Sequence, residues 1–251
     1  MSLVMNMRQH LRRVVKYPAL IVFLISGLLI SVLLFFFYNV RINRFIAKYW
    51  FRCLLFILNL KLETKGIDKE LEGHFLVANH ISWLDIPVIS ACMPTCFLSK
   101  SEVRQWPVIG LLARFVGTIF IARASRRALM EVNQKIDCSL RDGNSVCVFP
   151  EGTTTLGDQV GLFHASIFQP VVNVGAKVTP VSIRYLDKNR VQTGCPAYVG
   201  DMTLLCSLDQ VVIESALIVE VSFLSTIDVK DLSRESISDL SRAMILTDLF
   251  K

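Results

Sequence analysis

Apolar residues form one long run near the N-terminus and several short runs further along the chain. The long run, residues 19–38, reads ALIVFLISGLLISVLLFFFY and carries no charge. It has about the 20 residues that a helix needs to cross a bilayer. The short runs predict strands, and two segments with apolar side chains at helical spacing predict helices. The strands are expected at 74–78, 146–149, 178–185 and 217–223, and the helices at 83–92 and 127–141.

This alternation of strands and helices predicts an α/β fold with a mostly parallel sheet flanked by helices. The composition changes near residue 62, where the apolar N-terminal part gives way to a globular pattern. We therefore expect a basic and hydrophobic membrane anchor at 1–62 and a globular domain at 63–251. In such a fold the chemistry is expected where strands end and loops lead into helices.

The apolar run is predicted to be a retained anchor, because it ends in the bulky residues 35–38 and not in a small-residue cleavage site. Basic residues flank it on both sides, so the positive-inside rule gives no direction. A single span and an in-plane or re-entrant hairpin with both ends on the cytoplasmic side both remain open. A second apolar run at 49–60 is too short to span and is predicted to lie in the membrane interface.

The net charge of +6 is concentrated at the N-terminus, where ten Lys and Arg residues precede residue 66 against one acid, Glu63. This distribution suits an anionic lipid surface. It does not suit nucleic acid, because no basic stripe lies on the globular part. A membrane is therefore an expected partner and nucleic acid is not.

The seven cysteines contain no CxxC pair, so no zinc or other metal site is expected. Their number is odd and their spacings are wide, which favours a reducing, cytosolic environment. Cys138 and Cys147 lie in apolar-patterned stretches and are predicted to be buried thiols.

The first candidate for chemistry is the segment that follows the predicted strand at 74–78. His80 comes just after this strand, and Asp85 is expected about one turn into the next helix. A carboxylate there can turn back and hold one ring nitrogen of the histidine as N–H, which leaves the other nitrogen as a general base. Taken alone, the pair could also be a packed histidine and a charge at a helix start.

Two further segments carry polar residues at strand ends. FPEGTTT at 149–155 follows a predicted buried strand, and its Pro-Gly turn would let a substrate approach the backbone. Glu151 and Thr153 could contact a ligand there, or be turn residues. A short predicted strand at 117–123 ends in Arg123, which could pair with a phosphate or carboxylate or lie at the surface.

Together these segments resemble the glycerolipid acyltransferase family of the lysophosphatidic acid acyltransferase type. The first family motif, NHxxxxD, is matched by Asn79, His80 and Asp85, and the third, FPEGT, by residues 149–153. The second motif is similar to the run from Gly117 to Arg123, and residues 178–181 are the counterpart of the fourth. The resemblance implies that His80 and Asp85 are catalytic. It also implies that the acceptor headgroup is held by Arg123, Glu151, Gly152 and Thr153.

The resemblance further implies transfer of a fatty acyl group from acyl-CoA or acyl carrier protein to the free hydroxyl of a lysolipid, without metal or bound cofactor. The acceptor expected first is 1-acyl-sn-glycerol-3-phosphate. Thr154 stands where many phosphate-headgroup members have arginine, so lyso-ornithine lipid or another lysophospholipid is the alternative. A non-catalytic membrane protein that binds lipids is a second alternative. The expected location is a bacterial inner membrane, with the globular domain on the cytoplasmic face.

Overall fold

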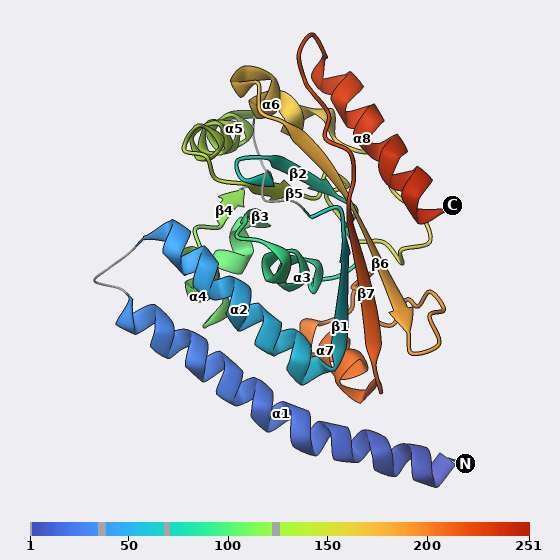
Figure 1. The fold of residues 1–251 in the computed structure, drawn as a ribbon. Coiled ribbons are helices and arrows are strands. Elements are labelled where there is room, and N and C mark those ends of the chain that lie inside the picture. The colour runs from blue at the N-terminus through green and yellow to red at the C-terminus, as the bar shows by residue number, and fades with distance from the viewer. Residues whose placement is uncertain (1, 35–38, 68–70, 122–125) are drawn as a thin grey trace.

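Seven strands form one sheet in the order β1-β7-β6-β2-β5-β3-β4 (Figure 1). The computed structural model describes residues 2–34, 39–67, 71–121 and 126–251. Neighbouring strands are parallel except β6 and β7, which are antiparallel. The predicted mostly parallel sheet is therefore confirmed. The strands are β1 (Leu60–Lys65), β2 (Phe75–Ala78), β3 (Cys96–Lys100), β4 (Ile119–Ile121), β5 (Val146–Val148), β6 (Val178–Asp187) and β7 (Leu217–Phe223).

Helices cover both faces of the sheet, as predicted. In Figure 1, α2, α3 and α7 lie below it, whereas α5, α6 and α8 lie above it. The helices are α1 (Ser2–Leu33), α2 (Val40–Leu58), α3 (Asp85–Cys92), α4 (Ile109–Phe115), α5 (Arg126–Arg141), α6 (Gln169–Val174), α7 (Leu204–Ile213) and α8 (Arg234–Leu249), with short 3-10 segments η3 (Ser101–Gln105) and η4 (Ala165–Phe168).

The central strand β2 is a short run without polar residues because it is buried on both faces of the sheet. Leu76 and Ala78 point into the core between the sheet and helices α2, α3 and α7. Phe75 and Val77 point into the core between the sheet and helices α5, α6 and α8. Successive side chains of a strand alternate between faces, so a strand buried on both faces must be apolar throughout. This run directs the chain to the carboxyl edge of the sheet at residue 79.

The predicted boundary between residues 62 and 63 falls inside β1. All residues from Leu60 to Lys65 pair with β7, so the sheet begins at Leu60.

One of the two thiols predicted to be buried differs from that expectation. Cys147 is buried as predicted, but Cys138 is exposed, because it lies on the outer side of α5.

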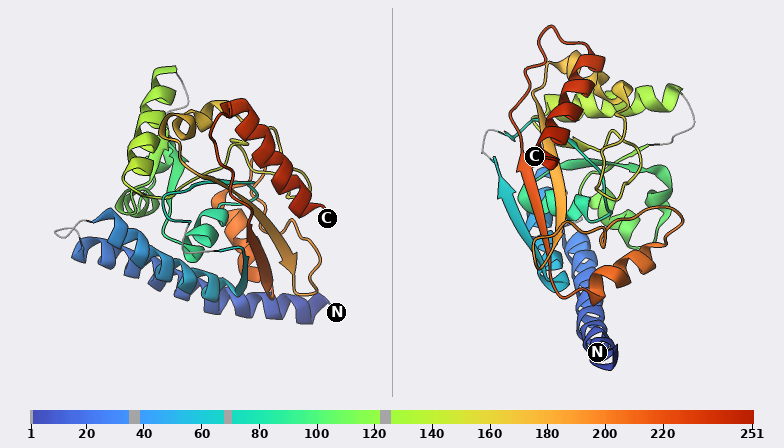
Figure 2. Two further views of the ribbon diagram at one scale, coloured as in Figure 1. Left: turned by 45° about the horizontal axis from the view of Figure 1, so that its top comes forward. Right: turned by 90° about the vertical axis from the view of Figure 1, so that its right-hand side faces the viewer.

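The N-terminal segment forms two antiparallel helices that lie side by side along the body (Figures 1 and 2). Among the described residues, α1 is the helix long and apolar enough to cross a membrane, over Asn6–Leu33. Residues 35–38 of the predicted span lie outside the described residues. The second apolar run, up to Leu58, is part of a longer helix, α2, whose start is capped by the side chain of Asn39, and Leu60 already belongs to β1.

Basic residues of α1 bind the globular domain. Arg13 makes two hydrogen bonds to Asp209 of α7, at 2.8 and 2.7 Å. The ammonium of Lys16 donates to the carbonyls of Leu58 and Glu214 at 2.9 and 3.3 Å. These cations therefore join α1 to α2 and to the globular domain, a role that the charge pattern did not predict.

Candidate active site

Asn79 fixes the point at which the chain leaves the sheet. Its side-chain amide donates to the carbonyl of Ile183 in β6 at 3.0 Å, and its carbonyl oxygen accepts from the N–H of Ile183 at 2.8 Å. Asn79 is buried, so these bonds compete with no solvent. The end of β2 is thereby joined to β6, and His80 follows at the edge of the sheet.

His80 and Asp85 are in direct contact, as predicted from their spacing. The distance from Nδ1 of His80 to Oδ2 of Asp85 is 2.7 Å. The same oxygen accepts from the backbone N–H groups of Ile81 and Ser82 at 2.7 and 2.9 Å. Asp85 is the first residue of α3 and does not lie one turn into it, which brings its carboxylate back over the preceding loop.

Tyr185 completes the surroundings of the carboxylate, and no sequence motif indicated it. Its hydroxyl donates to Oδ1 of Asp85 at 2.8 Å across 100 residues of chain. Both side chains are buried, Asp85 completely. Burial, followed by the neighbouring Asp85, raises the pKa of Tyr185 well above its ordinary value, so the phenol remains a proton donor.

The imidazole of His80 is held on one side by an aromatic ring. Phe149 stacks on it with a centroid distance of 4.0 Å and an interplanar angle of 14°. The carbonyl of His80 accepts from the N–H of Thr155 at 2.9 Å. Because 20% of the His80 side chain stays exposed while Nδ1 is bound to Asp85, the ring is both oriented and reachable.

Glu151 lies beside His80 but binds its backbone. Oε1 accepts from the N–H of His80 at 2.7 Å, and Oε2 accepts from the N–H of Gly161 at 2.7 Å. Glu151 as a whole is only 6% exposed. Burial raises the pKa of Glu151 above its ordinary value, although the two amide donors oppose that shift. A direct role in binding the headgroup stays a prediction for this residue.

The other predicted residues of the third motif form a turn beside His80 and Asp85. Gly152 has φ +68°, a conformation in which a side chain would be strained. Thr153 is exposed at this turn. The hydroxyl of Thr154 donates to the carbonyl of Tyr198, whose N–H in turn donates to the carbonyl of Ile81 at 3.0 Å. The turn is therefore tied to the loop that carries His80.

Arg123 lies outside the described residues. The strand before it, β4, pairs in parallel with β3, and Lys100 at the end of β3 is opposite Ile121. In the sheet order, β3 lies between β5, which leads to Glu151, and β4, which leads towards Arg123. Lys100 is thus a cation at the carboxyl edge of the sheet, the edge at which β5 leads to Glu151. Sequence reasoning did not identify this lysine. The signal available was an apolar run at 96–98 followed by Ser99 and the lysine.

Comparison with known proteins identifies a family for this chain. Residues 62–184 match a family model described as acyltransferase. The chain is 34% identical to the 1-acyl-sn-glycerol-3-phosphate acyltransferase of Neisseria meningitidis serogroup B over 203 residues, which cover 78% of this chain and 79% of that protein. This chain belongs to the acyltransferase family. The acyltransferase is also 32% identical to the lyso-ornithine lipid O-acyltransferase of Pseudomonas aeruginosa over 205 residues, covering 82% and 78% of the two chains.

The fold of this acyltransferase has a solved counterpart. The crystal structure of the 1-acyl-sn-glycerophosphate acyltransferase of Thermotoga maritima aligns with a TM-score of 0.65 at 22% sequence identity. The alignment covers 98% of this chain and 96% of that chain. The shared architecture thus includes the N-terminal helices as well as the sheet.

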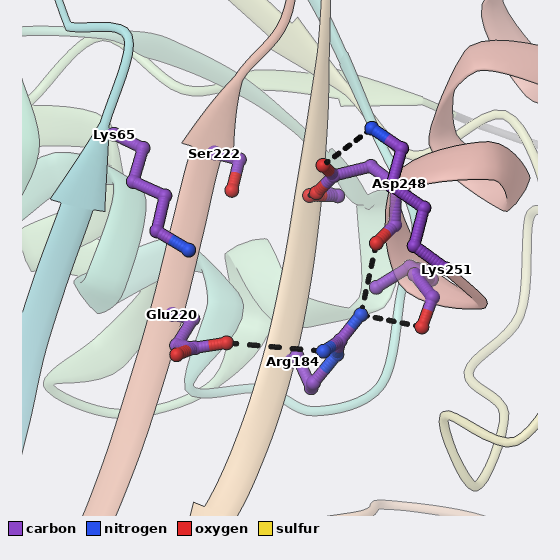
Figure 3. A pocket seen from close by; sticks show the side chains of 8 residues that line it. Lys65, Arg184, Glu220, Ser222, Asp248 and Lys251 are labelled. Carbon is purple, nitrogen blue, oxygen red and sulfur yellow. Dashed lines mark hydrogen bonds and ion pairs between the residues drawn. The ribbon is translucent and has the colours of Figure 1, made fainter.

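Two hollows lie elsewhere on the acyltransferase. One, of about 230 Å³, is polar, and its lining includes Arg184, which is 3.9 Å from Glu220 and donates to the carbonyl of Asp248 at 3.0 Å (Figure 3). Because Arg184 and Tyr185 are adjacent on β6, they point to opposite faces of the sheet. This hollow therefore lies across the sheet from Asp85, and its charges are largely paired with each other.

The second hollow, of about 450 Å³, is mainly apolar and lies between α7 and the loops that follow Thr155 and Gly194. Tyr198, which binds both Ile81 and Thr154, belongs to the second of these loops. The apolar residues that line this hollow are Leu156, Ala197, Val199, Met202 and Ile213. Such a lining suits hydrocarbon more than a charged group.

Proposed function

We propose that this acyltransferase moves a fatty acyl group from a thioester to the free hydroxyl of a lysolipid, with His80 as general base. The observation that carries the proposal is the 2.7 Å contact between Nδ1 of His80 and the buried carboxylate of Asp85. This contact holds the proton on Nδ1 and leaves Nε2 to accept another. Membership of the family and its lysolipid-acylating relatives supply the reaction class.

In the proposed reaction Nε2 of His80 takes the proton of the lysolipid hydroxyl as its oxygen attacks the thioester carbonyl. The carbon–oxygen bond forms, and a tetrahedral intermediate carries the negative charge. When the intermediate collapses, the carbon–sulfur bond breaks and the thiolate takes the proton from His80. The proposed route needs no metal and no resident cofactor, because the substrate hydroxyl is itself the nucleophile.

The donor is proposed to be acyl-CoA or acyl carrier protein, since both present the thioester that this route requires. The first acceptor proposed is 1-acyl-sn-glycerol-3-phosphate, the substrate named for the Neisseria relative. Lyso-ornithine lipid, named for the Pseudomonas relative, is the second. Thr154 favours lyso-ornithine lipid as the acceptor. Its hydroxyl donates to the carbonyl of Tyr198, whereas an arginine at this position would offer a cation to a phosphate.

The membrane association is proposed to be in-plane, with α1 and α2 lying along the surface. Apolar side chains of α1 are exposed from Met7 at 68% to Leu33 at 71%, while Leu20 and Phe23 pack on the body. A helix with one face on lipid and the other on the domain suits the interface better than a crossing. The bacterial inner membrane is the proposed location, with the domain on its cytoplasmic face.

The exposed apolar stripe of α1 continues onto α2. The exposed apolar side chains that form it are Met7, Leu11, Val14, Val15, Ile21, Val22, Ile25, Leu29, Val32 and Leu33 of α1, with Ile42, Phe45, Tyr49 and Phe56 of α2. Protease accessibility of tags at both chain ends tests this arrangement in inverted vesicles. Cleavage of both tags from the cytoplasmic side supports the in-plane hairpin, and cleavage of one contradicts it.

The reaction is tested by acyl transfer from acyl-CoA and from acyl carrier protein to a panel of lysolipids, with free thiol as the second readout. His80→Ala should lower turnover by about a hundredfold or more while the unfolding temperature is kept. His10→Ala, which removes an exposed histidine of α1, is the matched control. A folded His80→Ala variant with near-normal turnover would overturn the proposed base. Lipid binding without thiol release would favour a non-catalytic role.

A further inference from the structure

The buried carboxylate of Asp85 has two oxygens with different partners. Oδ2 faces Nδ1 of His80 and also accepts from the N–H groups of Ile81 and Ser82, which are all local in sequence. Oδ1 accepts from the hydroxyl of Tyr185 at 2.8 Å. A carboxylate can rotate about a single bond, and a partner on each oxygen restricts that rotation more than partners on one oxygen alone. Tyr185 supplies the hold on Oδ1.

Tyr185 is itself fixed by the sheet. It belongs to β6, is 1% exposed and packs in the core between the sheet and helices α2, α3 and α7. Ile183, two positions earlier on the same strand, is bound through its backbone to the side chain of Asn79, the residue before His80. The strand that carries the tyrosine and the loop that carries the histidine are therefore joined directly.

We propose that Tyr185 is a positioning residue for acyl transfer, which holds the Asp85 carboxylate so that Oδ2 stays aligned with Nδ1 of His80. The phenol also shares the negative charge of the carboxylate, and so moderates its attraction for a protonated imidazole. The inference rests on the proposed function, because it assumes that His80 is the base. The phenol touches no substrate and acts only through Asp85.

Several other ionisable groups lie around this carboxylate. They are His80 on the loop after β2, Glu151 after β5, Cys147 on β5 and Tyr185 on β6. Burial raises the pKa of Cys147 and that of Tyr185 well above their ordinary values, so both stay protonated near neutral pH. Glu151 is present in every variant below, so a comparison between variants cancels its contribution.

The test is Tyr185→Phe, which deletes one oxygen and keeps the ring. We expect kcat to fall about ten- to hundredfold, as for loss of a hydrogen bond to a charged group, with KM for the lysolipid changed little. Without the phenol the carboxylate attracts a proton on the neighbouring imidazole more strongly. The acidic limb of the pH profile of kcat/KM should therefore move to higher pH, by up to about one unit.

Tyr17→Phe is the matched control. Tyr17 also donates to a carboxylate, Asp209, at 2.9 Å, but at the junction of α1 and α7. It should leave the acidic limb where it is in the wild type. If Tyr185→Phe remains folded by circular dichroism, with unchanged kcat and an unchanged acidic limb, the proposed role of Tyr185 is wrong.

Asp85→Asn supplies a second and independent measurement. If Tyr185 acts through Asp85, adding Tyr185→Phe to Asp85→Asn should lower kcat by less than threefold, because the two effects are not additive. Multiplication of the two single losses would contradict the inference. Failure of the proposed function looks different, since His80→Ala would then stay active whatever the result for Tyr185.

Discussion

The backbone N–H of His80 and the side chain of Glu151 are joined by a hydrogen bond of 2.7 Å. The second oxygen of Glu151 accepts from the N–H of Gly161, also at 2.7 Å. A single buried carboxylate thereby connects the loop after β2 with the loop that follows the third motif. Two buried donors require an acceptor that can serve both, and a carboxylate does this with one oxygen for each.

Glu151→Gln should separate a positioning role from a role in binding the headgroup. A glutamine amide has one acceptor oxygen, so its NH2 must face one of the two N–H donors. We expect kcat to fall about tenfold or more with KM for the lysolipid little changed, and unfolding to become easier by about 1–3 kcal/mol. Steady-state kinetics and denaturant unfolding measure these quantities. A rise in KM at constant kcat would instead indicate a headgroup contact.

Glu235→Gln is the control for this change of chemistry. Glu235 pairs with Arg234 on the exposed side of α8, at 2.7 Å, and surface ion pairs of this kind contribute little. This variant should leave both kinetics and stability near those of the wild type.

The stability of the protein should depend on pH through Glu151. Burial raises the pKa of Glu151 above the ordinary value of 4.5, so the folded state holds the proton more firmly than the unfolded state. The stability linked to this proton is fully present below pH 4.5 and is lost as pH rises through the raised pKa. In Glu151→Gln the position cannot titrate. The difference in unfolding free energy, wild type minus variant, should therefore decrease with rising pH, and an increase would contradict this.

Much of the fold and the centre of the site followed from local pattern. β2 and β5 were predicted because strands buried on both faces must be apolar. β6 and β7 were predicted from longer apolar-rich runs, the second of which alternates at Glu220 and Ser222. The contact of His80 with Asp85 was predicted because five residues of loop and helix start can bring them together. β1 was not predicted, because four of the six residues of its sequence LKLETK are polar, as suits an edge of the sheet.

The parts that the sequence did not predict depend on contacts between distant residues. Tyr185 meets Asp85 only through the order of the strands, which no local pattern specifies. The antiparallel direction of β7 likewise depends on how the chain returns after α7. The basic residues of α1 were assigned to lipid because a charge pattern does not reveal that Asp209 faces Arg13. Arg123 was predicted as a ligand contact and stays a prediction.

Lys100 is expected to bind the phosphate of a substrate. It lies at the end of β3, between the strands that lead to Glu151 and towards Arg123. Lys100→Gln should raise KM for a phosphate-bearing acceptor about three- to tenfold, with kcat little changed. The difference from the wild type should shrink at high salt, because an exposed ion pair is screened. Lys135→Gln, an exposed change on α5, is the control. An unchanged KM for every acceptor and donor tested would contradict the prediction.

The junction of Asp209 with α1 should control how firmly the N-terminal helix lies on the domain. Asp209 accepts two hydrogen bonds from Arg13 and one from Tyr17 at 2.9 Å, and the bond with Arg13 lowers its pKa. Asp209→Asn removes the charge and one acceptor oxygen. Amide hydrogen exchange at residues 9–18 of the vesicle-bound protein should then become severalfold faster, whereas Asp239→Asn on the exposed side of α8 should not change it.

Acidification should loosen the same junction in the wild type. Because the pKa of Asp209 is lowered by folding, the stability that it contributes is present above its ordinary value of 3.8 and is lost as pH falls through the lowered pKa. Exchange in the wild type should therefore approach that of Asp209→Asn only at acidic pH. Equal exchange in the two proteins at neutral pH would show that the apolar contacts of Leu20 and Phe23 hold α1 without help from this pair.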